Sequence, residues 1–318
     1  MKKSGIVIIV SFLILFICHC KKDARIPILS TTAISNLTSK TATCGGNINS
    51  DGGSAVTERG VCWSIVVNPT IANNRTMNGT GIGSYTSILT GLSTKTNYFV
   101  RAYATNANGT AYGEDISFST LQTLTDKDGN YYDTLTIGTQ TWMIADLKTT
   151  RYNDSTSIPY VSDNAEWINL ITPALCYYEN DIVNKTTYGN LYNWYVVETC
   201  KICPVGWHVP SNAEWLILIN YLGGESVAGG KLKEIGITHW LTPNAGANNE
   251  SGFAALPSGN RIGADGSFYS LGTYACYWSS DPSGNTQALN RVLVFDGTNF
   301  RIGFDNKTVG FSIRCVKD

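Results

Sequence analysis

The chain has 318 residues and a formal net charge of −1, with 15% of its residues charged. This length suits two domains, and the balanced charge excludes the basic footprint of a nucleic-acid-binding protein. Glycine and tyrosine are plentiful, which is typical of turn-rich β modules outside the cytosol.

Residues 1–20 are interpreted as an export signal. Lysines near the start precede an apolar run over residues 6–17, which is too short to span a bilayer. The run leads to Cys18 and Cys20, and this pattern resembles a bacterial lipoprotein signal, whose cysteine becomes the acylated first residue. We expect lipidation at Cys20, with Cys18 as the alternative, followed by a tether over residues 21–27. A secretory signal without lipid is the other interpretation.

Residues 28–120 read as short alternating strands separated by turns such as SDGGSA and NANGTA. The stretch containing Leu92 and Tyr98 resembles the end of a fibronectin type III domain, in which a tyrosine pins a strand to the preceding loop. We therefore expect an all-β sandwich that acts as a spacer. The expected strands are 41–48, 58–65, 84–89, 97–105 and 112–120.

Export to an oxidising compartment favours disulfides among the cysteines beyond the signal. In the sandwich, Cys44 and Cys62 are expected on strands of opposite sheets. If both side chains point inward they form a disulfide between the sheets, and two buried free thiols are the alternative. The odd total leaves at least one cysteine unpaired: Cys44, Cys62, Cys176, Cys200, Cys203, Cys276 and Cys315.

Residues 121–318 form the second module. Its motifs DGNYYDTLTIGTQTWMIADL, YGNLYNWYVV, CPVGWHVPSNAEWL and GFSIRCVKD closely resemble the Fibrobacter succinogenes major paralogous domain family. The resemblance implies an α+β, C-type-lectin-like fold on secreted or surface proteins, with no established reaction, so no catalytic residue is expected. It also makes Cys203 and Cys315 structural cysteines, which we expect to pair. Cys200 and Cys276 could form an extra bridge.

The stretch CPVGWHVPSNAEWL places a thiol, an imidazole and a carboxylate close together, at Cys203, His208 and Glu214. Ser211 lies three residues before Glu214 and an apolar run follows, which predicts a capping box and a helix starting at residue 212. Glu214 then has a structural role. Zinc binding is a weaker alternative, because the usual spacing of zinc ligands is absent. A redox CxxC motif at Cys200 and Cys203 is also weaker, because a reactive cysteine of this kind stands at a helix N-terminus and the helix here starts only at residue 212.

No cofactor is expected, and calcium is the alternative. Asp126, Asp128 and Asn130 imitate the start of a calcium loop, but the terminal glutamate is missing, so a hairpin turn is favoured. A lectin-type calcium site requires carboxamide and carboxylate ligands at the positions where this sequence has Ser279 and Ser280, so such a site is not favoured.

The favoured function is that of a non-catalytic binding or adhesion lipoprotein, anchored in the outer membrane and exposed at the surface, whose head meets a glycan or protein. A periplasm-facing or secreted protein is the alternative location. Alternative functions are an oxidase of the formylglycine-generating type, whose second late cysteine is missing, and an assembly protein without a small ligand. The candidate ligand contacts follow the YWSSD motif: Trp278, Asp281, Asn290, Arg291, Asn299, Arg301 and Asp305.

Overall fold

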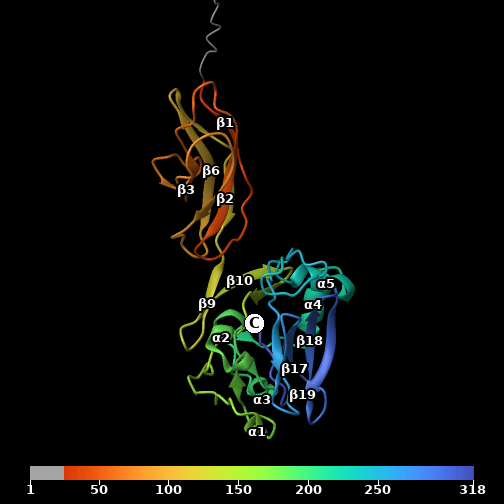
Figure 1. Cartoon of the computed structure of the whole chain (residues 1–318). Helices are drawn as coiled ribbons and strands as arrows, with labels where there is room; N and C mark the ends of the chain where they lie inside the picture. The colour runs from red at the N-terminus through yellow and green to blue at the C-terminus, as the bar shows by residue number, and fades with distance from the viewer. Residues whose placement is uncertain (1–24) are drawn as a thin grey trace, which may run out of the picture. The chain divides into compact units, whose positions relative to one another are not determined.

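The computed structural model describes residues 25–318, so the export signal and both candidate lipidation cysteines lie outside the described residues. The chain divides into two compact units. One contains residues 43–89 and 98–118 with the described residues up to 35, and the other contains residues 36–42, 90–97 and 119–318 (Figure 1). None of the helices in the described part is long and apolar enough to span a membrane.

The first unit consists of two sheets, and its expected all-β character is confirmed. Ile48 of one sheet and Ala104 of the other share a buried cluster with Val56, so the sheets pack face to face. One sheet has the order β1 (Ile28–Thr31), β2 (Ala42–Ser50), β5 (Gly83–Leu89). The other has the order β4 (Asn74–Arg75), β3 (Glu58–Ser64), β6 (Asn97–Asn106), β7 (Gly109–Tyr112), with β8 (Ile116–Ser119) also pairing with β6.

The predicted disulfide between Cys44 and Cys62 is wrong, because both are free, buried thiols. Cys62 pairs in register with Arg101, whose side chain is half exposed, so both project from the outer face of their sheet. There the Cys62 thiol donates to the Pro69 carbonyl at 3.3 Å, whereas the Cys44 thiol donates to the Thr32 carbonyl at 3.3 Å. Burial raises the pKa of Cys62 to about 11, which keeps this thiol protonated.

The second unit, called the head below, contains two larger sheets and one small one. The first has the order β14 (Trp207–His208), β20 (Val316–Lys317), β11 (Gln140–Met143), β10 (Tyr131–Ile137), β9 (Gln122–Thr125). The second has the order β16 (Phe268–Leu271), β15 (Ser258–Arg261), β17 (Tyr274–Pro282), β18 (Gln287–Val294), β19 (Phe300–Asn306). The small sheet pairs β12 (Leu175–Cys176) with β13 (Leu191–Tyr192).

Helices flank these sheets. The predicted helix is α4 (Asn212–Tyr221), and its capping box is confirmed: the Ser211 hydroxyl accepts from the Glu214 N–H, and the Glu214 carboxylate accepts from the Ser211 N–H. Gly223, with a φ of 99°, ends the helix as expected. The other helical segments are α1 (Asn164–Trp167), η1 (Tyr178–Asn180), α2 (Ile182–Tyr188), α3 (Trp194–Glu198) and α5 (Glu225–Leu232).

Strand β17 is buried on both faces. Its side chains alternate, so Cys276 and Trp278 enter one hydrophobic cluster while Ala275 and Tyr277 enter another. The suggested bridge between Cys200 and Cys276 is therefore wrong: Cys276 is enclosed by this core, whereas Cys200 is an exposed free thiol. The head thus combines sheets with short helices, while the expected α+β, C-type-lectin-like fold stays a prediction.

Candidate functional site

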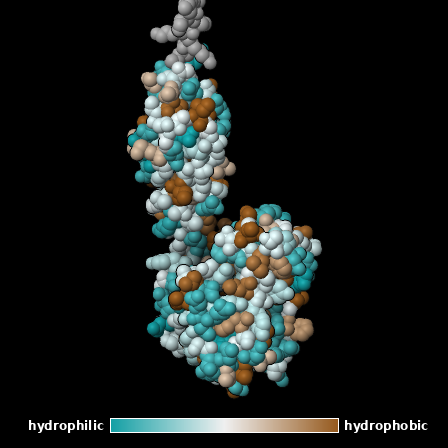
Figure 2. Space-filling model, viewed as in Figure 1, coloured by the Kyte–Doolittle hydropathy of each residue, from teal (hydrophilic) through white to brown (hydrophobic). Residues whose placement is uncertain are grey.

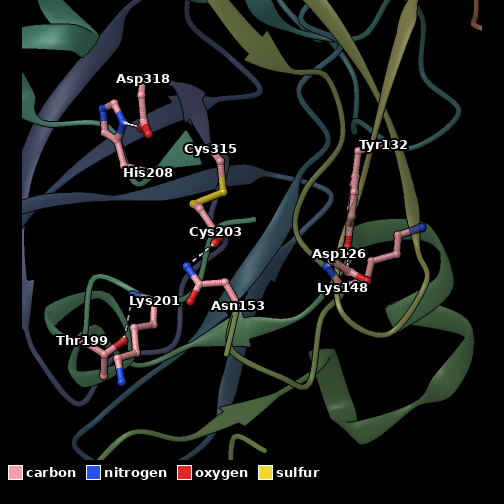
Figure 3. The surroundings of a disulfide bond; sticks show 10 residues. All are labelled: Asp126, Tyr132, Lys148, Asn153, Thr199, Lys201, Cys203, His208, Cys315 and Asp318. Atoms are coloured by element: carbon pink, nitrogen blue, oxygen red, sulfur yellow. Dashed lines mark hydrogen bonds and ion pairs between the residues drawn. A yellow bond between two sulfur atoms is a disulfide. The ribbon is translucent and has the colours of Figure 1, made fainter. Parts of the chain in front are cut away.

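The expected disulfide between Cys203 and Cys315 is present (Figure 3). It joins residues 112 positions apart in the chain, with their Cα atoms 6.0 Å apart. Both cysteines are buried, and the Asn153 side-chain amide donates to the Cys203 carbonyl at 3.1 Å. The bond ties the loop before α4 to the last strand of the head. Cys315 is thus not free to serve as one of the two late cysteines that the oxidase alternative requires.

His208 lies between two carboxylates. Its Nδ1 is 2.7 Å from Asp318 Oδ1 (Figure 3). Its Nε2 is 2.7 Å from Glu214 Oε1. The other Glu214 oxygen accepts from the N–H and hydroxyl of Ser211, both at 2.8 Å. Because both ring nitrogens are occupied, the imidazole is arranged to bridge α4 to the end of the chain and not to act as a base.

The stabilising effect of His208 should depend on pH. Partial burial alone would lower the pKa of His208, but hydrogen bonds and charge from Asp318 and Glu214 outweigh burial and raise it above the ordinary 6.5. Stability from this bridge is then fully present below pH 6.5 and lost as pH rises through the raised pKa. We expect His208→Gln to shift the urea midpoint most at acidic pH. If the difference in urea midpoint between the parent and His208→Gln grows from about pH 6 to about pH 9, this account is contradicted.

The hairpin between β9 and β10 is held by its own carboxylates. Asp126 accepts from the Tyr132 hydroxyl at 2.6 Å (Figure 3). It also accepts from the Asn130 side-chain amide at 2.8 Å. Asp128 accepts from the Thr150 hydroxyl at 2.8 Å and forms an ion pair with Arg151. These oxygens are occupied by protein donors, as in a structural turn. Within residues 25–318 no group of three or more His, Cys, Asp or Glu side chains is placed to hold a metal ion.

Three of the candidate ligand contacts are interior residues, and their assignment as surface contacts is wrong. Trp278 is 0% exposed, and its Nε1 donates to the Tyr192 carbonyl at 2.8 Å. Asn290 is 0% exposed and donates to the Asp305 carboxylate at 2.7 Å. Arg291 is 1% exposed. The reason is that β17 and β18 are central strands of a sheet covered on both faces.

The other four candidates do not form one site. The Asp281 carboxylate accepts from the Asn212 N–H at the start of α4, so it has a structural partner. Arg301 and Asp305 lie near opposite ends of β19, and half-buried Asn299 lies in the loop before it. Sequence proximity to YWSSD therefore does not bring these side chains together.

Two hollows on the described surface have polar side chains that already have partners. One, about 800 Å³, lies on the first unit beside β1 and β7. Its Ser50, Thr110 and Tyr112 hydroxyls all have hydrogen-bond partners. A hollow of about 300 Å³ on the head includes Arg151 and Asn153, which are engaged with Asp128 and Cys203. Neither hollow offers a set of free groups to orient a ligand.

The Tyr195 groove is different. It consists of two adjoining hollows of the head, about 560 and 250 Å³, that share Ile171 and Tyr195. Helix α3 presents Tyr195 half exposed while its neighbours Trp194 and Val196 are buried. The Trp194 Nε1 donates to the Ser279 carbonyl at 2.9 Å, which fixes the helix and hence the tyrosine.

Four polar side chains of the Tyr195 groove are uncharged and unpartnered within the described chain, whereas Asn169 and Thr199 donate to backbone carbonyls of the head. The side chains of Tyr195, Thr286, Asn306 and Thr308 have no hydrogen-bond partner among residues 25–318. The one carboxylate at its rim, Glu198, lies 3.4 Å from Lys307 Nζ. The groove therefore combines an aromatic ring and aliphatic surface with hydroxyl and amide groups that a ligand can bond.

The structure defines a mostly β protein whose second unit, the head, contains a disulfide. The family model of the Fibrobacter succinogenes major domain matches residues 135–317, so the chain belongs to this family, as its motifs predicted. No curated protein matches the sequence.

Solved structures show distant likenesses. One is the sensor domain of the anti-sigma factor RsgI4 in Pseudobacteroides cellulosolvens, with a TM-score of 0.24 and 12% identity over 30% of this chain and 95% of that chain. Another is the third fibronectin III domain of human KIAA0343 protein, with a TM-score of 0.22 and 18% identity over 33% of this chain and 89% of that chain. These likenesses are too distant to inform function.

Proposed function

We propose that the chain is a non-catalytic binding and adhesion protein whose head holds a neutral glycan in the Tyr195 groove. The observation that supports this is the set of unpartnered hydroxyl and amide groups beside a half-exposed tyrosine (Figure 2 shows the mixed polar and apolar surface of the head on one face). A sugar presents C–H faces that pack on an aromatic ring and hydroxyls that exchange hydrogen bonds with such groups. The paired state of Glu198 suits an uncharged ligand.

Removing the aromatic ring should weaken glycan binding. We expect Tyr195→Ala to bind an array-selected glycan about tenfold more weakly, or ~1.4 kcal/mol, because the ring supplies the apolar surface of the groove. Calorimetry measures this loss on residues 21–318, the chain without its signal and without the candidate lipidation cysteines, which is called the processed chain below. Tyr131→Ala is the matched control, since Tyr131 is 77% exposed on β10 and does not line the groove.

Binding is expected to be the same with calcium and with a chelator, because the acidic side chains of the β9–β10 hairpin are engaged by protein donors. An array on which the processed chain binds no glycan, with or without calcium, would remove the proposal. Equal losses of glycan affinity in Tyr195→Ala and Tyr131→Ala would show that the groove is not the binding site, but they would not contradict glycan binding by the chain.

We also propose that acylation at Cys20 anchors the chain in the outer membrane with the head exposed at the cell surface. The support is the apolar run followed by cysteine and a Lys- and Asp-containing tether. Cys20→Ala should abolish palmitate labelling and release the chain from the membrane. Labelling that persists in this variant would move the anchor to Cys18, and a head protected from protease on whole cells would place it in the periplasm.

A further inference from the structure

Strand β19 forms an open edge of the head. In the order β16-β15-β17-β18-β19 it is the last strand, and among the described strands it pairs with β18 alone. Figure 1 shows β17, β18 and β19 side by side in the blue part of the chain. An edge strand carries unpaired N–H and C=O groups that can accept another strand. No proline or lysine interrupts β19, whose sequence is FRIGFDN.

The side chains of this edge suit an interface, because two are apolar and exposed and two are charged without an ion partner in the described chain. Ile302 is 49% exposed and Phe304 is 63% exposed, and both lie on the same face of the strand. Arg301 and Asp305 lie on the other face and form no ion pair with any residue of the described chain. Burial raises the pKa of Asp305, although the Asn290 amide donates to it, as for a carboxylate that lacks a cation.

The sequence of β19 is complementary to itself. When two copies run antiparallel about Gly303, Arg301 of each copy faces Asp305 of the other, and Ile302 faces Phe304. Gly303 faces itself at the twofold axis. Opposite charges and apolar pairs directly across an antiparallel ladder are stabilising, whereas like charges are not. A peptide of arbitrary sequence could form hydrogen bonds with the backbone of this edge, but it would not supply both the charged pair and the apolar pair.

We propose that the partner of β19 is a second copy of the chain, joined antiparallel about Gly303 so that two heads share one continuous sheet. The contact is isologous, because the same residues serve on both sides of a twofold axis, so it closes at a dimer and does not propagate. Arg301 and Asp305 acquire the ion partners that they lack within one copy. The exposed Ile302 and Phe304 become covered. This inference is independent of the proposed glycan site.

Sedimentation equilibrium of the processed chain tests the dimer. Cys200 is replaced by Ser throughout, so that its exposed free thiol cannot link two copies. We expect a monomer–dimer equilibrium between about 1 and about 100 µM. Phe304→Lys should raise the dissociation constant about tenfold or more, while Ile237→Lys should leave it unchanged. Ile237 is the matched control because it is 66% exposed outside β19.

Charge exchange tests the register. Arg301→Asp places carboxylates opposite one another and should dissociate the dimer, and Asp305→Arg should do the same with two cations. Mixing the two variants should restore a dimer, because each carboxylate of one chain then faces a guanidinium of the other at both positions. A parent chain that stays monomeric throughout this range would overturn the proposal. So would a dimer that survives Arg301→Asp and Phe304→Lys in chains whose circular dichroism is unchanged.

Discussion

Replacing Cys203 and Cys315 together by Ala is expected to lower the free energy of unfolding of the head by about 4 kcal/mol, because the bond closes a loop of more than a hundred residues. Both cysteines are buried, so small apolar side chains suit their surroundings. Urea unfolding followed by tryptophan fluorescence reports mainly on the head, since all the tryptophans except Trp63 lie there.

Cys200→Ser is the control for this experiment, because Cys200 is exposed and unpaired. Its unfolding free energy should change by less than about 0.5 kcal/mol. If the double variant unfolds at the same urea concentration as the parent, the disulfide does not hold the loop before α4 to the final strand.

Asp146→Ala is expected to cost about 3–5 kcal/mol, because it leaves the guanidinium of Arg314 buried without its counter-charge. Arg314 Nε lies 2.7 Å from Asp146 Oδ1, and the side chains are 1% and 3% exposed respectively. The guanidinium also lies 4.0 Å from the centre of the Phe253 ring. Removing both charges together, with Asp146→Leu and Arg314→Met, should cost less than Asp146→Ala alone.

The matched control is the exposed pair of Asp154 and Lys201, whose charged atoms are 3.0 Å apart. Asp154→Ala should leave the urea midpoint nearly unchanged, since solvent screens this pair. Equal losses of unfolding free energy in Asp146→Ala and Asp154→Ala would show that burial does not make the ion pair of Asp146 and Arg314 stronger than the exposed one.

Local features of the fold could be predicted from the sequence. The capping box of Ser211 and Glu214 depends on four consecutive residues, and the structure has both of its hydrogen bonds. The Cys203–Cys315 pairing came from the family resemblance and not from spacing, because 112 residues separate the two cysteines. Composition and alternation also indicated the all-β first unit.

Features that depend on distant chain segments could not be predicted. Cys62 was expected to face Cys44, but the loop carrying Pro69 buries it on the outer face of its sheet. Trp278 was considered a ligand contact because it stands in YWSSD, yet both faces of β17 are covered. A continuous apolar run such as YACYW is typical of a strand covered on both faces, but it does not show which distant segments cover each face.

The Tyr195 groove was missed for the same reason. Its walls come from Ile171, Tyr195, Thr286 and Asn306, which more than one hundred residues of chain separate. The motif YGNLYNWYVV contains Tyr195, but it indicated only the family. Once α3 was known to be a helix, the i, i+3 spacing of Tyr195 and Glu198, which lie on one face beside buried Trp194 and Val197, could have identified the outward side.

The most direct test of glycan binding by the Tyr195 groove is an amide chemical-shift map of the processed chain titrated with an array-selected oligosaccharide. The account predicts that the largest shifts fall on Ile171, Tyr195, Thr286, Asn306 and Thr308. It also predicts that these shifts disappear in Tyr195→Ala and persist in Tyr131→Ala. Largest shifts on β1 and β7 of the first unit, or at the hairpin between β9 and β10, would contradict it.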